Sequence, residues 1–157
     1  MRIDLIVPGS TGERWIRDGV SAYIGRIQHY APFRVRELPA VKNAASLTPL
    51  QLQQEEYLQL KKLTKEFDRL VLLDESGTQF RSVEFADFLQ KQMNAGTRAL
   101  CFFAGGPYGF APELRAAGYP MMSLSKMTFT HQMVRLVFTE QLYRAFTILK
   151  GEGYHHE

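Results

Sequence analysis

The chain has 157 residues, of which 45% are hydrophobic and 22% are charged, and its formal net charge is +3 at pH 7. This length predicts one domain, spanning 1–157, that buries a core without disulfides or a structural metal. No apolar run reaches the roughly 18 residues of a membrane span. The opening MRIDLIVPGS is too short in its apolar part for a signal peptide, so we expect a cytoplasmic protein.

The first half of the chain alternates between strand-like and helix-like patterns. Residues 2–9 (RIDLIVPG) predict a strand, and residues 13–30 have apolar side chains at helical spacing. The alternating FRVRELP (33–39) predicts a second strand. Residues 47–67 predict a long amphipathic helix, with Thr48 as its cap and Pro49 in its first turn.

The second half continues the alternation and ends in a long helix. Buried strands are expected at 69–77 and at 97–109, where the strand runs into a glycine loop, and a last, poor strand is expected at 119–125. Helices are expected at 82–96 with Ser82 as the cap, at 111–118, and at 130–150 with Thr130 as the cap.

Strands that alternate with helices through short connections predict the α/β class, with a mostly parallel sheet and helices on both of its faces. In such sheets ligands bind beyond the carboxyl ends of the strands. Three segments qualify, because each follows a strand and precedes a helix: LLDESG (72–77), FAGGPYG (103–109) and SLSKMTFT (123–130). We expect them to meet at one crevice.

The glycine loop does not have the motif of a common nucleotide-binding site. FAGGPYGF lacks the GxGxxG spacing of dinucleotide-binding proteins, and the chain has no GxxxxGK[ST] phosphate loop. Gly105 and Gly106 either turn the chain or allow its backbone to approach a flat or bulky ligand.

The final helix has more apolar residues than one contact surface needs. Its apolar side chains cover most of the circumference of 133–149, whereas a helix on one side of a sheet needs a single stripe. The surplus predicts a second surface, most simply a subunit partner with Phe138 at the interface. His131, Arg135 and Thr139 form a polar line at i, i+4 and i+8, and Glu140 can reach Arg144.

Two features have plain structural interpretations. The single Cys101 lies in the apolar run ALCFFA, which favours a buried thiol over a reactive one. The terminal GEGYHHE is short and polar like a frayed end, and its adjacent histidines lack the further ligands of a metal site. We therefore expect no metal.

Three stretches together identify a family resemblance. GGPYG after a buried strand, LSKMTFTHQMVRLVFTEQLYRAF and the terminal GYHHE resemble the RlmH family of the SPOUT superfamily of RNA methyltransferases. The resemblance covers the whole chain, and its C-terminal third is the specific part. It implies an α/β sheet with a deep C-terminal trefoil knot, a homodimer, and methylation of N3 of a pseudouridine in 23S rRNA on assembled ribosomes.

The resemblance also implies where the cofactor S-adenosylmethionine binds. Its predicted contacts are Leu73, Gly105, Leu124, Ser125, Lys126, Met127, Thr128 and Phe129. The polar loop before the final helix would hold the cofactor, and the helix itself would contact a second subunit.

The chemistry of the reaction suggests three catalytic residues. N3 of pseudouridine carries a weakly acidic proton, and His155 is the candidate base that removes it. Arg135 is the candidate to stabilise the developing negative charge or to hold a phosphate. Tyr154 would stack on or hydrogen-bond the base. The sequence leaves open which subunit supplies this tail.

Two alternatives belong to other classes of protein. A dimeric RNA-binding or nucleotide-binding regulator would have the same fold without turnover. An enzyme with a nicotinamide cofactor is disfavoured by the missing GxGxxG motif. The first 45 residues have seven positive charges against four negative ones, which is only a mild basic excess for an RNA partner.

Overall fold

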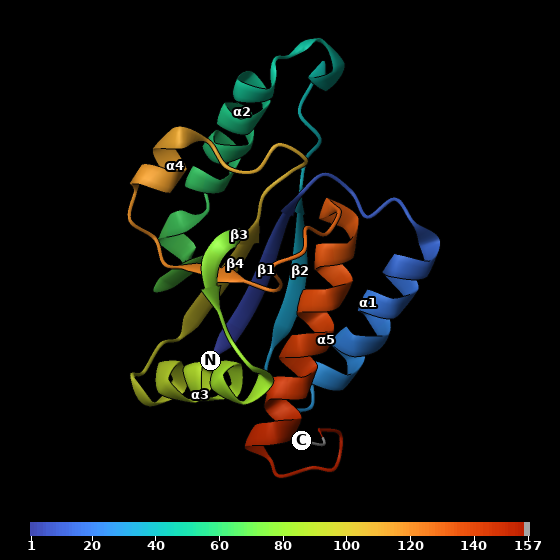
Figure 1. Ribbon diagram of the computed structural model, residues 1–157, viewed down its shortest axis with the longest axis vertical. Helices are drawn as coiled ribbons and strands as arrows, with labels where there is room; N and C mark the ends of the chain where they lie inside the picture. Colours follow the sequence, from blue (N-terminus) through green and yellow to red (C-terminus); the bar gives the residue numbers. More distant parts are fainter. Residues whose placement is uncertain (156–157) are drawn as a thin grey trace.

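Strands and helices alternate along the chain in the computed structural model, which describes residues 1–155 (Figure 1). The strands are β1 (Arg2–Pro8), β2 (Phe33–Leu38), β3 (Arg69–Gln79), β4 (Ala99–Ala104) and β5 (Met121–Ser123). The helices are α1 (Arg14–Ile27), α2 (Pro49–Lys61), α3 (Ser82–Asn94), α4 (Pro112–Ala116) and α5 (His131–Leu149), with short 3-10 turns at Ala44–Ser46 and Thr64–Glu66.

The strands form one sheet of five strands in the order β2-β1-β4-β3-β5. Every pair of neighbouring strands is parallel, which confirms the predicted parallel sheet. The carboxyl ends of the strands therefore meet at one edge of the sheet. This is the edge at which the sequence predicted a crevice.

Helices cover both faces of the sheet, as predicted. One face packs against α1, α3 and α5 through a core that includes Leu5, Phe102 and Phe138. The other face has a smaller core, in which Leu60 of α2 and Leu114 of α4 meet the strands. Cys101 belongs to this second core and is fully buried, and burial raises the pKa of its thiol, as expected of a structural cysteine.

Most helix ends agree with their predicted signals. The Thr48 side chain accepts a hydrogen bond from the Gln51 amide in a capping box, and Thr130 caps α5 through the Met133 amide. Two boundaries were wrong. α2 ends at Lys61, six residues before the predicted position, and the cap position of α3 is Arg81, so Ser82 is the first helical residue.

The apolar surplus of α5 is largely covered within the chain. α1 and α3 both pack against α5 on the same face of the sheet (Figure 1). Phe138 has an exposed fraction of 0% and its ring centroid lies 4.7 Å from that of Phe102. The prediction that Phe138 lies at a subunit interface is therefore wrong, because this residue belongs to the core. The homodimer itself stays a prediction.

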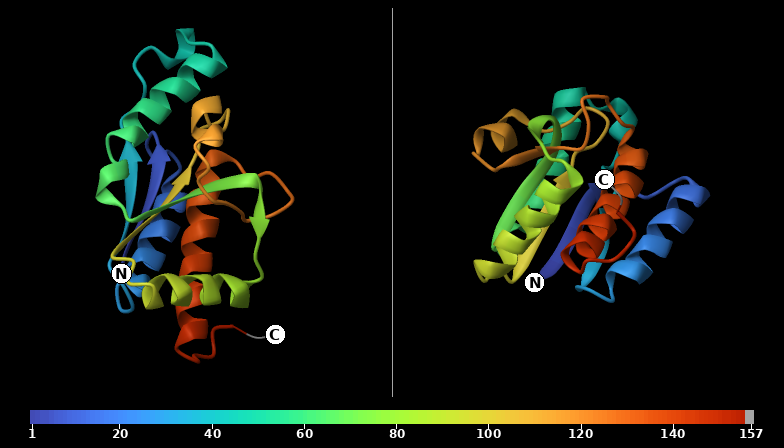
Figure 2. Two further views of the ribbon diagram at one scale, coloured as in Figure 1. Left: turned by 90° about the vertical axis from the view of Figure 1, so that its left-hand side faces the viewer. Right: turned by 60° about the horizontal axis from the view of Figure 1, so that its bottom comes forward.

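Strand β3 pairs with β5 in two places, and the register shifts between them. Met122 is the partner of Leu73 before this shift and of Thr78 after it. Gly77 lies between the two paired parts of β3. A Cβ on this residue would lie 2.6 Å from the backbone of Met121 and Met122, so only glycine fits there. Figure 2 shows this segment of β3 beside the chain that leads into α5. The trefoil knot stays a prediction.

Candidate functional site

A cavity of about 630 Å³ opens at the carboxyl ends of β3, β4 and β5. This is the position where parallel sheets bind ligands, and the volume is in the usual range for small-molecule sites. All three predicted segments contribute to it. The lining residues are Leu73, Asp74, Glu75, Ala104, Gly105, Gly106, Pro107, Tyr108, Gly109, Phe110, Arg115, Leu124, Ser125, Met127, Thr128, Phe129, Thr130, His131 and Val134.

The cavity gathers all but one of the residues predicted to contact a cofactor. Leu73 and Gly105 line it from β3 and from the glycine loop, and the loop 124–129 contributes every predicted residue except Lys126. Lys126 is exposed and is not among the lining residues.

The loop before α5 is fixed by its own polar side chains. Ser125 Oγ accepts a hydrogen bond of 2.9 Å from the Met127 amide, and Ser123 Oγ donates one of 2.9 Å to the Ser125 carbonyl. Thr128 Oγ1 donates to Glu75 Oε2 at 2.8 Å, which joins this loop to the second half of β3. The loop therefore presents its backbone to the cavity in a defined conformation, although it contains no regular secondary structure.

Gly105 marks a close approach in the glycine loop. A Cβ at this position would lie 3.0 Å from the ring of Phe110 and 3.1 Å from the Gly109 carbonyl carbon. The crowding comes from the chain's own Phe110 and Gly109, so it does not separate a glycine that turns the chain from one that lets the backbone approach a ligand. A side chain here would press on the wall of the cavity.

An ion pair at the cavity was not predicted from the sequence. Arg115 Nη2 donates to Asp74 Oδ2 at 2.7 Å, and its guanidinium also lies 5.7 Å from the centroid of the Phe110 ring. Burial would raise the pKa of Asp74, but hydrogen bonds from Ser76 and the charge of Arg115 outweigh it and hold that pKa below its usual value. Asp74 is therefore a carboxylate at neutral pH.

His131 is the imidazole that lines the cavity, at the first position of α5. Burial and the nearby positive charge of Arg135 both lower the pKa of His131 from its usual value of 6.5. The imidazole is therefore neutral at pH 7, and a neutral imidazole can accept a proton. The sequence placed His131 only on a polar line of the helix.

Arg135 lies behind the cavity. Its exposed fraction is 1%, and its guanidinium donates hydrogen bonds of 2.7 Å to Thr11 Oγ1 and to the Pro8 carbonyl. A weaker contact of 3.5 Å reaches Glu37. These bonds fix the loop after β1 against α5. Arg135 and Thr139, the second and third residues of the predicted polar line on α5, are both buried. The predicted role of Arg135 toward a substrate stays a prediction.

The C-terminal tail packs on the far end of α5. The Tyr154 hydroxyl donates to Glu140 Oε1 at 3.1 Å, and its ring lies 4.7 Å from the Arg144 guanidinium carbon and 4.8 Å from the Tyr143 ring centroid. The expected pair of Glu140 and Arg144 is present at 2.7 Å. Burial, and then the hydrogen bond with Tyr23, raise the pKa of Tyr154, so its hydroxyl remains protonated. Tyr154 is therefore ordered by specific contacts.

His155 is the last residue of the described part of the chain. The Nδ1 atom of His155 is buried and has no hydrogen-bond partner among residues 1–155. Buried polar atoms of this kind usually have a partner. The adjacent His156, also part of the tail, lies outside the described residues.

The described tail residues do not line the cavity of their own chain. His131, the first residue of α5, lines the cavity, whereas Tyr154 contacts Glu140, Tyr143 and Arg144 further along the helix. Glu140 lies nine residues after His131, which is roughly 14 Å along the helix axis. The predicted catalytic residues of the tail are therefore separate from the predicted cofactor site of the same chain.

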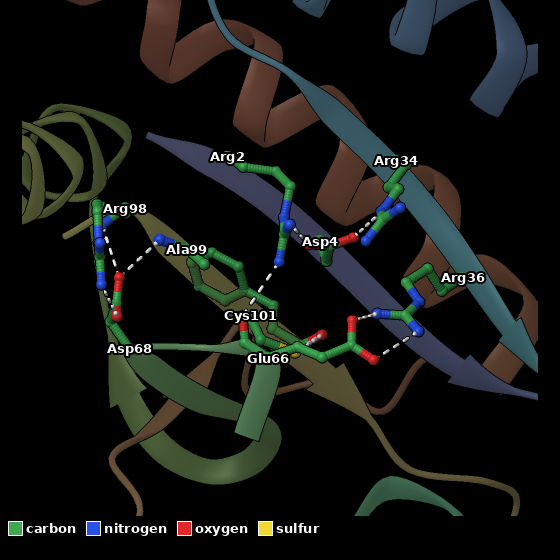
Figure 3. A network of polar contacts seen from close by, with 10 residues as sticks. Arg2, Asp4, Arg34, Arg36, Glu66, Asp68, Arg98, Ala99 and Cys101 are labelled. Carbon is green, nitrogen blue, oxygen red and sulfur yellow. Dashed lines mark hydrogen bonds and ion pairs between the residues drawn. The ribbon is translucent and has the colours of Figure 1, made fainter. Parts of the chain in front are cut away.

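Several arginines at the amino ends of the strands are already paired with acids (Figure 3). Arg2 and Arg34 both contact the buried carboxylate of Asp4. Arg36 pairs with Glu66 at 2.6 Å, and Arg98 lies 3.8 Å from Asp68. Three of the seven basic residues counted in the first 45 positions, Arg2, Arg34 and Arg36, are thus paired with acids.

Residues 1–155 contain no group of three or more side chains that could hold a metal ion. No helix in this part of the chain is both long enough and apolar enough to cross a membrane.

Known proteins resemble this chain over its whole length. A family model described as "Predicted SPOUT methyltransferase" matches residues 1–155. A protein named ribosomal RNA large subunit methyltransferase H from Parabacteroides distasonis is 44% identical, covering 100% of both chains. A relative of the same name from Christiangramia forsetii is 46% identical and covers 99% of both chains.

Two solved structures have a similar fold. A probable methylase family protein from Haemophilus influenzae aligns with a TM-score of 0.52 at 11% identity, covering 99% of this chain and 70% of that chain. A putative methylase family protein from Neisseria gonorrhoeae aligns with a TM-score of 0.50 at 13% identity, covering 99% and 85%.

Proposed function

This chain belongs to the SPOUT methyltransferase family, and we propose that it transfers a methyl group from S-adenosylmethionine to N3 of a pseudouridine in 23S rRNA. The observation that carries this proposal is the cavity at the carboxyl ends of the strands, because the family's cofactor segments converge there. The match of the family model to residues 1–155 supports a single SPOUT domain.

The lining of the cavity suits this cofactor. Residues of the glycine loop and most residues of the loop 124–129 line it, and Leu73 and Phe129 contribute apolar surface. Gly105 packs so closely against Phe110 that a side chain here would push on this wall of the cavity. Leu73, Gly105 and the loop would hold the adenosine part, while Asp74 and Arg115 lie at the same cavity as charged partners for its polar end. When bound, the cofactor supplies a methyl group that its sulfonium has already activated.

The protein's own contribution to the reaction is positioning and proton removal. The methyl group and N3 must be aligned about 3–3.5 Å apart for an in-line displacement. His155 is the proposed base that takes the proton from N3, which typically contributes about 10²–10⁴-fold to a rate. Tyr154 remains a neutral phenol, so it contacts the target base as a hydrogen-bond donor or by stacking. The Nδ1 atom of His155 has no hydrogen-bond partner, which supports a role in which a substrate or a second subunit supplies that partner.

The active site is proposed to form between two subunits. No described residue of the tail lines the cavity of its own chain, and Tyr154 contacts α5 at Glu140, roughly 14 Å along the helix from His131. In a homodimer, Tyr154 and His155 of one subunit would complete the cavity of the other. This arrangement accounts for a tail that is ordered yet remote from every predicted cofactor contact.

The RNA substrate is proposed to be an assembled ribosome in the cytoplasm. The arginines of the sheet's amino end are mostly paired with acids, so the chain offers limited free positive charge for a phosphate backbone. A ribosome presents the target nucleotide in a fixed shape, which reduces the need for electrostatic attraction.

The test is methyl transfer from labelled S-adenosylmethionine to ribosomal particles and to naked 23S rRNA. The proposal predicts transfer to ribosomes and much less to naked RNA. Cofactor binding without transfer to any particle would favour the alternative, a dimeric regulator with the same fold.

A further inference from the structure

The glycine loop, residues 105–109, is held from outside the cavity by helix α2. Gln53 Nε2 donates a hydrogen bond of 2.5 Å to the Tyr108 carbonyl. Three residues further along the same helix, Glu56 Oε2 accepts a hydrogen bond of 3.2 Å from the Gly106 amide. Neither Gln53 nor Glu56 lines the cavity. The helix therefore supports the wall of the cavity from behind.

Glu56 is an unusual residue in this helix. Its exposed fraction is 6%, whereas its neighbour Glu55 is exposed. Burial raises the pKa of Glu56, and the hydrogen bond from the Gly106 amide opposes that rise. Within the described chain, no lysine, arginine or histidine forms a salt bridge with it. A buried carboxyl group without a cation is costly, so a leucine would be the more stable choice for folding alone.

The carboxyl group fits closely against Gly106. A Cβ on Gly106 would lie 2.8 Å from Oε2 and 2.9 Å from Cδ of Glu56, so a larger residue here would displace the carboxyl group. Gly106 in turn closes the loop, because its carbonyl accepts a hydrogen bond of 3.0 Å from the Gly109 amide. Glu56 thus fixes the residue next to Gly105.

We propose that Glu56 is a positioning residue for the cofactor: it holds the Gly106 amide so that Gly105 and Gly106 form the wall that receives S-adenosylmethionine. This inference rests on the proposed function. Glu56 touches neither the cofactor nor the target base. Glu56 orders the loop before the cofactor binds. The free energy of binding is then not reduced by the entropy that would be lost in ordering the loop.

The test compares three variants. Glu56→Gln keeps an oxygen acceptor for the Gly106 amide, Glu56→Leu removes the acceptor at similar volume, and Glu55→Leu is the matched control on the exposed side. Cofactor affinity is measured by calorimetry, and exchange of the Gly106 amide proton is measured by NMR in the protein without cofactor. Methylation of ribosomes gives kcat and KM.

We expect Glu56→Leu to raise both Kd and KM for S-adenosylmethionine by at least about tenfold, on the order of 1.4 kcal/mol. Because Glu56 does not touch the reacting atoms, kcat should change far less than KM. Exchange of the Gly106 amide should become faster. Glu56→Gln should restore most of the affinity, and Glu55→Leu should behave like the wild type.

A second pair of variants covers the case in which Glu56→Leu does not fold. Gly106→Ala should weaken binding because its Cβ displaces the carboxyl group, and adding Glu56→Ala should cost little more, since both changes break the same contact. Independent, additive losses would overturn the inference, as would a folded Glu56→Leu with wild-type Kd and wild-type exchange. A wild-type protein that does not bind S-adenosylmethionine would overturn the proposed function as well.

Discussion

The hydroxyl of Tyr154 donates a hydrogen bond to Oε1 of Glu140, 14 residues earlier, at 3.1 Å. This contact joins the C-terminal tail to the middle of α5, where Arg144 also pairs with Glu140. The tail is thus ordered by specific contacts, and none of its described residues lines the cavity of its own chain. The position of the tail leads to the first two predictions.

Deletion of residues 154–157 should leave the affinity for S-adenosylmethionine unchanged, because no described residue of the tail lines the cavity. Methylation of ribosomes should fall by about 10²-fold or more if His155 is the base. Calorimetry and a methyl-transfer assay measure the two effects. Full activity of the shortened chain would mean that the tail has no catalytic role.

A mixture of two inactive variants should regain activity if the tail acts on the partner subunit. One variant lacks residues 154–157, and the other has Gly105→Val in its cavity but keeps its tail. Random reassociation of the subunits should restore roughly a quarter of wild-type activity, because a mixed dimer contains one complete site. A mixture that remains as inactive as its components would place each tail in its own subunit's site or outside catalysis.

Gly105→Val should weaken binding of S-adenosylmethionine by more than about tenfold, or 1.4 kcal/mol. The new side chain would press on the Phe110 ring, 3.0 Å from its Cβ, at the wall of the cavity. Gly12→Val is the matched control, since a Cβ at that position meets nothing within 4 Å. Calorimetry on both folded variants decides the prediction, and equal affinities would remove Gly105 from the site.

Arg135→Met should destabilise the protein by about 2–4 kcal/mol, because the buried Pro8 carbonyl and the Thr11 hydroxyl lose their donor. Urea unfolding measures this change. If the variant instead keeps wild-type stability and loses only methylation, Arg135 acts on the substrate as the sequence suggested.

The imidazole of His131 should titrate below 6.5 in an NMR experiment, since burial and the charge of Arg135 both lower its pKa. Between that pKa and 6.5 the unfolded chain binds a proton that the folded chain does not. The stability of the folded state should therefore fall as the pH decreases through this window. His131→Gln should remove this part of the pH dependence. An imidazole pKa at or above 6.5 would contradict the prediction.

The sequence was sufficient to predict the three segments that line the cavity, because each follows a strand and parallel strands end at one edge of the sheet. It could not reveal Glu56, whose partner Gly106 lies 50 residues away and whose helix has no local sign of a buried acid. It also misplaced Phe138. An apolar helix that packs between two others has the same residue pattern as a helix at a dimer interface, and only the packing of α1 and α3 against α5 separates the two.

The central claim is best tested by mass spectrometry of 23S rRNA from cells with and without the gene for this chain. We predict a methyl group on N3 of one pseudouridine that is present with the gene, absent without it, and restored by the purified protein and S-adenosylmethionine on isolated ribosomes. Identical modification of the rRNA in both strains, together with no transfer by the purified protein, would contradict the account.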